Sequence, residues 1–558
     1  MQTIIDAIKT VAKETFNADV QPELTRPEEQ FGDYSTNAAL QLAGKVGKKP
    51  REVAEKFVEL LKARLGEDVK EISIAGPGFI NILLSDKALL EQVKAAPTTK
   101  PQTYKDKVVV AEYSDPNPFK VLHAGHLYTT LVGDSIATLF EIAGAKVHRV
   151  NYGGDVGLHV ARAMWGIIQE LGGENPEKLQ QVAENERPVW LSQFYVKGTA
   201  AYETNEQAKA EIIEINKRVY ELHTSDDHDS PFAQIYWTCR QWSYDGFDKL
   251  YKELGVQPFE RYIPESESTP KGILLVERGL SEGVFEKSDG AVIFKGEEHG
   301  LHTRVFINSN GLPTYEAKDL GLAEIKWQDY KFDKSFIITG NEQIGYMKVV
   351  VKALEHFHPG ITERTTHLTH GMIRLPGGKK MSSRKGNNPK AKDILSAASA
   401  ANKQARGNDD PRVSIGAVKY AFLKHRIGGD MIYDPEESVS LEGNSGPYLQ
   451  YAHARANSIL AKVKTNAEDS SSLEALERSL ARKISEYPEA IARSVNELMP
   501  HYIAVYLYQL AQVFNRFYEK NKVVGDSREG VRAYLTSQYA NVLKDGLNLL
   551  GIAAPEKL

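Results

Sequence analysis

The spacing of apolar positions along the first hundred residues predicts a separate α+β unit. Apolar residues recur with helical spacing over residues 4–12, and two short apolar strands over 69–74 and 79–84 flank a Gly-Pro-Gly turn. The stretch 95–104 contains two prolines and is typical of a linker. We therefore expect an N-terminal α+β domain over residues 1–100.

A strand that is apolar on both faces opens the next part of the chain. Residues 107–112 are almost fully apolar, which is what a parallel sheet covered on both sides requires. A long apolar helix over 126–143 and a second strand over 146–151 complete a βαβ unit. The pattern predicts an α/β domain with a Rossmann-like parallel sheet over residues 105–390.

The remainder of this domain has a mixed pattern. Later strands are expected at 292–294, 304–307 and 336–339. Between about 160 and 262 the pattern is mostly helical, with few strand signals. We interpret this stretch as a helical insertion between two halves of the sheet.

The last third of the chain has helical periodicity. From about residue 392 it looks all-helical, and helices alone over such a length imply a bundle. We expect a linking helical segment over 391–440 and an all-helical bundle over 441–558.

Composition narrows the class of protein. A chain of 558 residues is too long for one core, and 41% hydrophobic with 26% charged residues indicates a folded globular protein. No run approaches 18 apolar residues and the start lacks a basic region before an apolar core, so we expect neither a transmembrane helix nor a secretory signal. The single cysteine, Cys239, excludes an internal disulfide framework and a zinc site built on several thiolates. We expect a cytoplasmic protein.

The charge distribution leaves the kind of partner open. With a net charge of −5, the chain could meet a nucleic acid only through a local basic patch. Residues 371–430 form such a patch, with 13 Lys or Arg against 4 Asp or Glu. A solvated surface explains the same charges equally well.

A tetrad lies between the first strand of the parallel sheet and its helix: His123-Ala124-Gly125-His126. Glycine lets a ligand approach the backbone, and a helix N-terminus favours anionic groups. Imidazoles can donate to phosphate oxygens as charge develops. The tetrad therefore indicates a phosphate site, and the alternative is a pair of loop histidines with structural hydrogen bonds.

A basic loop is the second chemical signal. Two glycines precede the run Lys379-Lys380-Met381-Ser382-Ser383-Arg384-Lys385, and Gly386-Asn387 follows it. Its hydroxyl and ammonium groups suit a triphosphate. Taken alone, the run could also be a solvated charged loop.

Together the two motifs resemble the paired signatures of class I aminoacyl-tRNA synthetases, which hold ATP between them. Other segments resemble the arginyl-tRNA synthetase family in particular, so that the resemblance covers nearly the whole chain. These segments are 110–126, which leads into the tetrad, 151–157, 442–452, and 31–37 together with 74–81.

The resemblance implies ATP-dependent attachment of L-arginine to tRNA(Arg) through arginyl-adenylate, as part of protein synthesis. Its partners would be tRNA(Arg), L-arginine and ATP, with Mg²⁺ accompanying ATP and no dedicated protein metal site. The N-terminal domain would contact the D-loop or elbow of the tRNA and the bundle would read the anticodon. We expect a monomer without membrane contact.

The resemblance also assigns site residues. The catalytic set is His123, His126, Lys120 and Lys380. The ATP-binding set is His123, Gly125, His126, Lys380, Met381, Ser382, Ser383, Arg384 and Lys385. The arginine-binding set is Glu112, Asn117, His123, Tyr315, Asp319 and Gln343. The tRNA-binding set is Phe31, Asn37, Tyr448 and Tyr451.

Two departures from the family pattern affect these assignments. Tyr128 stands where the family often has arginine, and Ser383 stands where the signature loop carries its second lysine. Arg384, Lys385 or Lys120 could supply the missing cation, and we favour Lys120 because it lies three residues before the tetrad.

Two other kinds of protein compete with this interpretation. A small nucleotidyltransferase can carry a similar tetrad but would need neither the N-terminal unit nor the bundle. A non-catalytic tRNA-binding relative would keep the bundle and lose the signatures.

Overall fold

A computed structural model describes residues 1–374, 376, 389–464 and 472–558 of the chain. A five-stranded parallel sheet lies at the centre of its fold. Neighbouring strands all run parallel, which confirms the Rossmann-like class expected from the sequence. In spatial order the strands are β12 (Thr365–His370), β11 (Lys334–Gly340), β5 (Val108–Glu112), β6 (Lys146–Gly153) and β7 (Arg261–Pro264).

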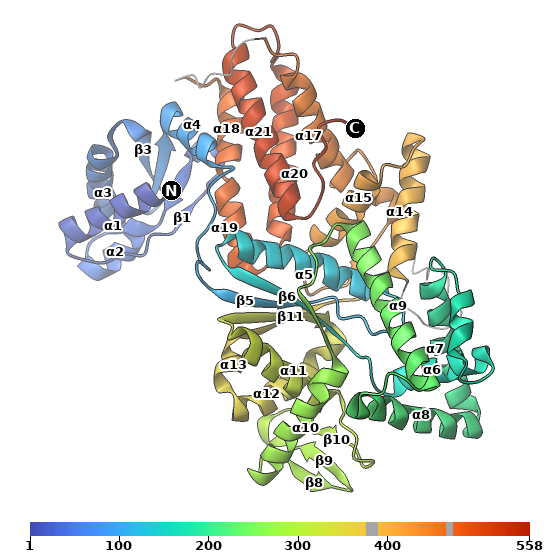
Figure 1. Cartoon of the computed structure of the whole chain (residues 1–558). Coiled ribbons are helices and arrows are strands. Elements are labelled where there is room, and N and C mark those ends of the chain that lie inside the picture. The colour runs from blue at the N-terminus through green and yellow to red at the C-terminus, as the bar shows by residue number, and fades with distance from the viewer. Residues whose placement is uncertain (375, 377–388, 465–471) are drawn as a thin grey trace.

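The sheet separates two hydrophobic cores, because successive side chains of a strand point to opposite faces. Val109 and Ala111 of β5 belong to the core that contains α5 (Ala124–Ile142), whereas Val110 belongs to the core on the other face. The helices on that second face lie below the sheet in Figure 1. They are α10 (Glu265–Ser281), α11 (Tyr315–Tyr330), α12 (Ile344–Phe357) and α13 (Pro359–Arg364).

Two of the later strands expected from the sequence are present, but they lie outside the parallel sheet. β9 (Ala291–Phe294) and β10 (Arg304–Ile307) form a separate antiparallel sheet with β8 (Glu286–Ser288). The reason is local: Asp289 and Gly290 both have positive φ and make a two-residue hairpin turn between β8 and β9. Such a short turn permits antiparallel pairing alone. The short helix η4 (Gly296–His299) connects β9 to β10.

A helical insertion lies between β6 and β7, as the sequence predicts. It has its own core, which includes the buried Cys239. Its helices are α6 (Leu158–Leu171), η3 (Pro176–Gln181), α7 (Arg187–Thr204), α8 (Glu206–Ser225) and α9 (Pro231–Leu254).

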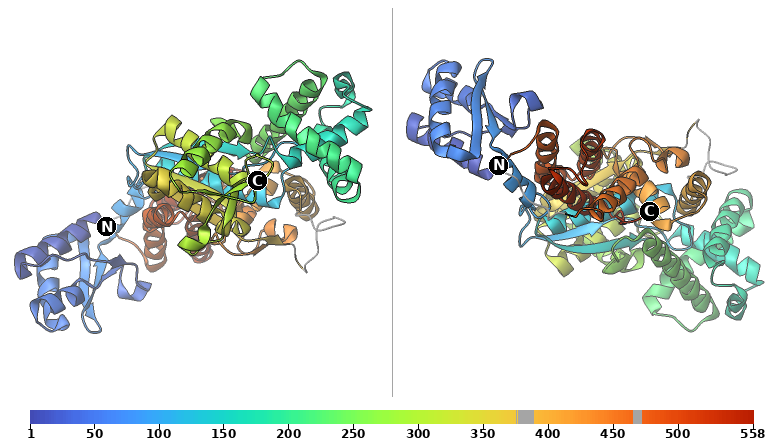
Figure 2. Two further views of the ribbon diagram at one scale, coloured as in Figure 1. Left: turned by 90° about the horizontal axis from the view of Figure 1, so that it is seen from below. Right: turned by 90° about the horizontal axis from the view of Figure 1, so that it is seen from above.

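The N-terminal unit is an α+β fold with an antiparallel sheet in the order β1-β2-β4-β3. Figure 2 shows it at the opposite end of the molecule from the insertion. Its elements are α1 (Gln2–Phe16), β1 (Leu24–Thr25), η1 (Glu29–Phe31), β2 (Tyr34–Thr36), α2 (Ala38–Val46), α3 (Pro50–Leu65), η2 (Gly66–Asp68), β3 (Val69–Ala75), β4 (Phe79–Leu84) and α4 (Asp86–Ala95).

In the described residues from 389 onward, the regular elements are helices apart from one short strand. That strand, β14 (Met431–Ile432), pairs in parallel with β13 (Ile373–Arg374). The linking helices are α14 (Ala391–Arg406), α15 (Pro411–Leu423) and α16 (Pro435–Ser438). The bundle consists of α17 (Gly446–Leu460), α18 (Ala475–Ser485), α19 (Tyr487–Glu497), α20 (His501–Lys520) and α21 (Glu529–Leu549).

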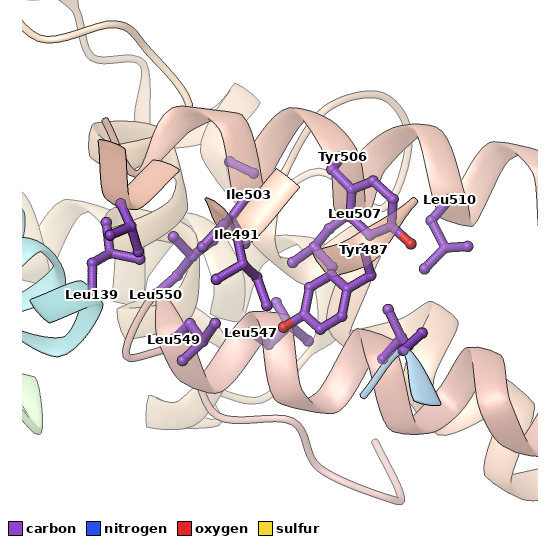
Figure 3. Close-up of a cluster of buried hydrophobic side chains, with 14 of the residues drawn as sticks. Leu139, Tyr487, Ile491, Ile503, Tyr506, Leu507, Leu510, Leu547, Leu549 and Leu550 are labelled. Atoms are coloured by element: carbon purple, nitrogen blue, oxygen red, sulfur yellow. The ribbon is translucent and has the colours of Figure 1, made fainter. Parts of the chain in front are cut away.

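The bundle packs directly on helix α5. Leu139 of α5 is fully buried and lies in one cluster with bundle residues that include Ile491, Ile503 and Leu550 (Figure 3). α5 is therefore covered by the sheet on one side and by the bundle on the other. This explains why it is apolar around most of its circumference. No helix among the described residues is long and apolar enough to cross a membrane.

Charged pairs join the N-terminal unit to the bundle. Arg478 of α18 donates to Asp33 at 2.5 Å and also to Asp86, and the Asp33 side chain is almost fully buried. Arg26 forms an ion pair with Glu489 of α19 at 2.8 Å. Buried pairs of this kind fix orientation, because a lost partner leaves a charge without compensation.

Replacing Arg478 by methionine should loosen the N-terminal unit from the bundle. The carboxylates of Asp33 and Asp86 would lose their guanidinium, and removing one partner of a buried pair costs about 3–5 kcal/mol. We expect a lower midpoint for the first thermal transition in calorimetry, and faster proteolysis of the linker at 96–104.

Arg493→Met is the matched control, because the pair of Arg493 with Glu497 is exposed on the surface of α19. If the two variants unfolded and were cleaved alike, Arg478 would have no special part in holding the unit in place.

Candidate functional site

The loop between β5 and α5 is held in an unusual backbone conformation. Ser114, Asp115 and Phe119 all have positive φ, at 76°, 49° and 64°, which costs a residue other than glycine about 1–3 kcal/mol. Side-chain hydrogen bonds hold the loop there. Asp115 Oδ1 accepts from the amide of Tyr152 at 2.7 Å, and the Phe119 amide donates to Ser243 Oγ at 2.9 Å. Strain of this kind is typical of functional loops.

The histidines of the tetrad cap the N-terminus of α5. His123 Nδ1 accepts from the amides of Gly125 at 3.1 Å and His126 at 3.4 Å, and His126 Nδ1 accepts from the amide of His123 at 3.3 Å. The two rings stack with centroids 3.8 Å apart. An imidazole that accepts at Nδ1 carries its proton at Nε2. Each ring therefore has one N–H to donate elsewhere.

Both histidines are neutral at physiological pH. Burial, followed by the nearby charge of Lys120, lowers the pKa of His123 to about 4. Burial, followed by His123 and Lys120, lowers the pKa of His126 well below its usual value. Any hydrogen bond that they make to an anion is thus a donation from a neutral imidazole.

Gly125 is required by the ring of His123. A Cβ at position 125 would come within 2.9 Å of His123 Cε1, and the ring cannot move without losing its capping bonds. The glycine also leaves the first turn of α5 open to a ligand.

A cavity of about 690 Å³ lies against these histidines, at the carboxyl ends of the parallel strands. The structure brings all the residues of the expected arginine-binding set to it, although they come from four separate segments. The lining includes Glu112, Asn117, His123, Tyr315, Asp319 and Gln343, together with Gly125 and His126.

One part of the cavity is acidic and buried. Glu112 forms an ion pair with Lys326, and Asp319 accepts from the Tyr346 hydroxyl at 2.5 Å. Burial raises the pKa of Asp319 to about 7, and burial with the nearby Glu112 raises the pKa of Asp115 well above its usual value. This arrangement suits a cationic ligand that cannot lose its charge, of which a guanidinium is the best example.

The opposite part of the cavity offers amides and an aromatic ring. Asn117 Oδ1 accepts from the Gly154 amide at 2.8 Å, which leaves its NH₂ group to donate. A Cβ at Gly154 would come within 2.8 Å of Asn117 Oδ1 and Glu265 Oε1, so a larger residue there would displace both side chains. The side chain of Tyr315 is half exposed.

The basic loop falls outside the described residues. This holds for Lys380, Met381, Ser382, Ser383, Arg384 and Lys385. The chain after it returns to the tetrad: the Ala124 amide donates to Pro389 at 2.7 Å, and the Ala391 amide donates to Leu122 at 2.9 Å.

Lys120 is placed differently from the other expected site residues. Lys120 is not among the described residues that line the cavity of about 690 Å³. Its ammonium lies 4.3 Å from the ring centroid of Tyr195 on α7, and burial lowers its pKa. It lines instead a neighbouring cavity of about 530 Å³, which Trp242 and Lys390 also line.

The expected tRNA-binding residues differ in exposure. Phe31 and Tyr451 are about half exposed, at 49% and 50%. Tyr448 accepts from Asn515 at 2.8 Å, and Asn37 accepts from Gln41 at 2.9 Å. The first two side chains are therefore available to a partner, whereas the last two already have intramolecular hydrogen bonds.

The sequence analysis missed several residues of the site. Asp115 lies three residues after the end of a buried strand, and Lys326 lies seven residues after Asp319 on the same face of α11, so both carried a signal. His370 stacks on Tyr128 with centroids 4.6 Å apart. This contact accommodates the tyrosine that departs from the family pattern.

The chain matches three protein-family models, one for each of its main parts. Residues 86–434 match the family model for "tRNA synthetases class I (R), catalytic domain". Residues 449–558 match the model for the "DALR anticodon binding domain", and residues 2–84 match that for the "Arginyl tRNA synthetase N terminal domain".

Individual relatives agree with the family models. The chain is 31% identical to an arginine–tRNA ligase of Flavobacterium psychrophilum, over 86% of this chain and 85% of the relative. It is 28% identical to one of Porphyromonas gingivalis, over 96% of each chain. Its fold is similar to that of the arginyl-tRNA synthetase of Thermus thermophilus, with a TM-score of 0.79 at 23% identity over the full length of both chains. For the Plasmodium falciparum enzyme the TM-score is 0.78 at 21% identity, over 100% of this chain and 99% of the other.

The raised pKa of Asp319 predicts how this residue affects stability. An unfolded aspartate ionises near pH 4, whereas the folded protein keeps this proton up to about pH 7. The ionised carboxylate therefore destabilises the folded state above pH 7, by at most about 4 kcal/mol. Asp319→Asn should raise the melting temperature at pH 8 and change it little at pH 4.

Asp333→Asn provides a control of opposite sign. The pKa of Asp333 is lowered by hydrogen bonds from the Val108 amide and from Lys107, so its carboxylate stabilises the folded state at high pH. That variant should melt below the wild type at pH 8, with the difference vanishing as the pH falls through the lowered pKa. A melting temperature of Asp319→Asn below that of the wild type at pH 8 would contradict the raised pKa of the Asp319 carboxyl group.

Proposed function

The chain belongs to the arginyl-tRNA synthetase family of class I enzymes, and on that premise we propose that its central cavity binds L-arginine and ATP for the charging of tRNA(Arg). The observation that carries this proposal is the meeting of two sites in one cavity. A phosphate-binding helix terminus with His123 and His126 lies beside the buried carboxylates of Glu112, Asp115 and Asp319.

Arginine would enter with its guanidinium in the acidic part of the cavity. Asp319 and Glu112 would accept from the planar fork of donors, which a carboxylate matches in geometry. Asn117 and Gln343 would hold the α-amino and carboxylate ends, and Tyr315 would cover the substrate at the mouth. The spacing of Tyr315 and Asp319 on one face of α11 supports this orientation.

ATP would bind with its phosphates at the N-terminus of α5. The Nε2–H groups of His123 and His126 would donate to phosphate oxygens, and Gly125 would let the nucleotide approach the backbone. Because both imidazoles are neutral donors held in place by capping bonds, they need no rearrangement as charge develops. Lys380, Met381, Ser382, Ser383, Arg384 and Lys385 enter this proposal as the nucleotide-binding loop of the family.

The reaction then follows from position. The arginine carboxylate attacks the α-phosphorus in line, a new O–P bond forms, and pyrophosphate leaves with the electrons of the broken P–O bond. A ribose hydroxyl of the terminal tRNA adenosine next attacks the carbonyl of arginyl-adenylate, and AMP leaves. The protein contributes orientation and charge stabilisation.

Cations complete the proposed site. Mg²⁺ would arrive with ATP. Lys120 is our candidate for the cation that replaces the second lysine of the loop. Its charge acts on both His123 and His126, and it would have to leave the ring of Tyr195 to reach a phosphate.

The tRNA would contact the two ends of the molecule. Phe31 and Asn37 would meet its D-loop or elbow, and Tyr448 and Tyr451 the anticodon. The half exposure of Phe31 and Tyr451 supports stacking on bases. The cytoplasmic location and the monomeric state stay predictions.

Exchange of pyrophosphate into ATP tests the proposed function. L-arginine should stimulate exchange in the presence of tRNA(Arg), and arginine should become attached to that tRNA. L-citrulline is the matched substrate control, since it replaces the guanidinium by a neutral urea and should give no exchange. A chain that binds tRNA but activates no arginine would be the non-catalytic relative. Exchange that depends on neither arginine nor tRNA would indicate a nucleotidyltransferase.

His126→Ala tests the role of the tetrad. If His126 donates mainly as charge develops, the variant should lose about 10²–10³-fold in turnover, with little change in the arginine KM. His302→Ala, which changes an exposed histidine far from the tetrad in sequence, serves as control. Turnover within threefold of the control would remove His126 from the catalytic set.

A further inference from the structure

Lys326 is a buried cation inside the acidic part of the cavity. Lys326 lies two turns after Asp319 on α11, and its ammonium donates to Oε2 of Glu112, which is 214 residues away in the chain. The side chains of Lys326 and Glu112 are only 3% and 4% exposed. A buried ion pair rarely stabilises a fold more than apolar residues of the same size would. Its presence here therefore calls for a functional reason.

The charge balance of the cavity supplies that reason. Besides burial, Glu112 and Asp319 both raise the pKa of Asp115, and Glu112 also raises the pKa of Asp319. The Lys326 ammonium opposes this effect on both Asp115 and Asp319. Glu265 also raises the pKa of Asp319, but it forms its own ion pair with Lys318 at 2.6 Å. Glu112, Asp115 and Asp319 therefore share the charge of Lys326, and a single guanidinium would bring the group closer to neutrality.

The pairing also orients Glu112. Lys326 occupies Oε2, and no hydrogen bond from a described residue reaches Oε1 of this carboxylate, which lines the cavity. Similarly, Oδ2 of Asp319 accepts a hydrogen bond from the Tyr346 hydroxyl. Each of these two carboxylates thus keeps one oxygen for a ligand while the other oxygen is held by the protein.

We propose that Lys326 is a positioning residue for arginine: its ammonium orients Glu112 and keeps the neighbouring carboxylates ionised to receive the guanidinium. The inference rests on the proposed function of the cavity. Lys326 does not contact the substrate but acts through Glu112 and through the charge that it places beside Asp319.

Lys326→Met tests the proposal, because methionine fills similar space without the charge. Arginine binding needs ionised carboxylates, so it weakens as the pH falls through the pKa of Asp319, and loss of the ammonium raises that pKa further. We expect kcat/KM for arginine to fall at least tenfold at pH 6.5, through KM more than through kcat. The loss should narrow by pH 9, with the midpoint of the acidic limb at least one pH unit higher.

Two further variants make the result decisive. Lys348→Met changes an exposed lysine on the neighbouring helix α12 and should leave the profile unchanged. Lys326→Arg retains the charge and should keep the wild-type midpoint even if the arginine KM rises. It provides the test if the methionine variant does not fold.

Some outcomes would overturn the proposal. A constant loss for Lys326→Met at every pH would indicate a purely structural lysine, and so would a shifted midpoint in Lys326→Arg. A profile of Lys326→Met that matches Lys348→Met would show that the ammonium has no part in binding. These failures are distinct from failure of the proposed function, in which the wild type itself would show no arginine-dependent exchange.

Discussion

The burial of helix α5 on two sides is the constraint on which the rest of the structure depends. Its side chains share one core with β5 and β11 of the sheet and with α19, α20 and α21 of the bundle. Because both faces are packed, the helix cannot shift along or around its axis without opening that core. The stacked histidines at its N-terminus therefore stand at a fixed place beside the carboxyl end of β5. In the proposed complex, this rigidity would hold the two neutral imidazoles in place as donors to a phosphate.

Electrostatics shapes the other half of the cavity. Burying Asp115 and Asp319 is unfavourable for the empty protein, as their raised pKa values show. In the proposed complex, the permanent charge of the guanidinium would offset that cost. The backbone at Ser114 and Phe119 is also strained. Hydrogen bonds with the insertion and with α5 hold it in that conformation.

The bundle and the catalytic sheet form one packed body through polar contacts as well. Lys419 of α15 donates to the carbonyl of Gly551, just after α21, at 2.6 Å, and burial lowers its pKa to about 8. The nearby Asp134 of α5 accepts from the Gln257 amide, just after α9 of the insertion, at 3.1 Å. The end of the chain, the insertion and the catalytic helix thus meet at one buried point. Movement of the bundle would disturb the helix that carries the tetrad.

The sequence by itself determined the features that depend on local pattern. The apolar run of β5, the helix after His123 and the hairpin glycine at Gly290 follow from periodicity, capping and turn chemistry, which act over a few residues. The motifs around Gly125 and Gly154 likewise indicated the site before any contact was known. Only the tertiary structure decided that Lys326 meets Glu112 and that Lys120 lies over Tyr195. Contacts between distant segments depend on how the whole chain packs, which a local pattern does not contain.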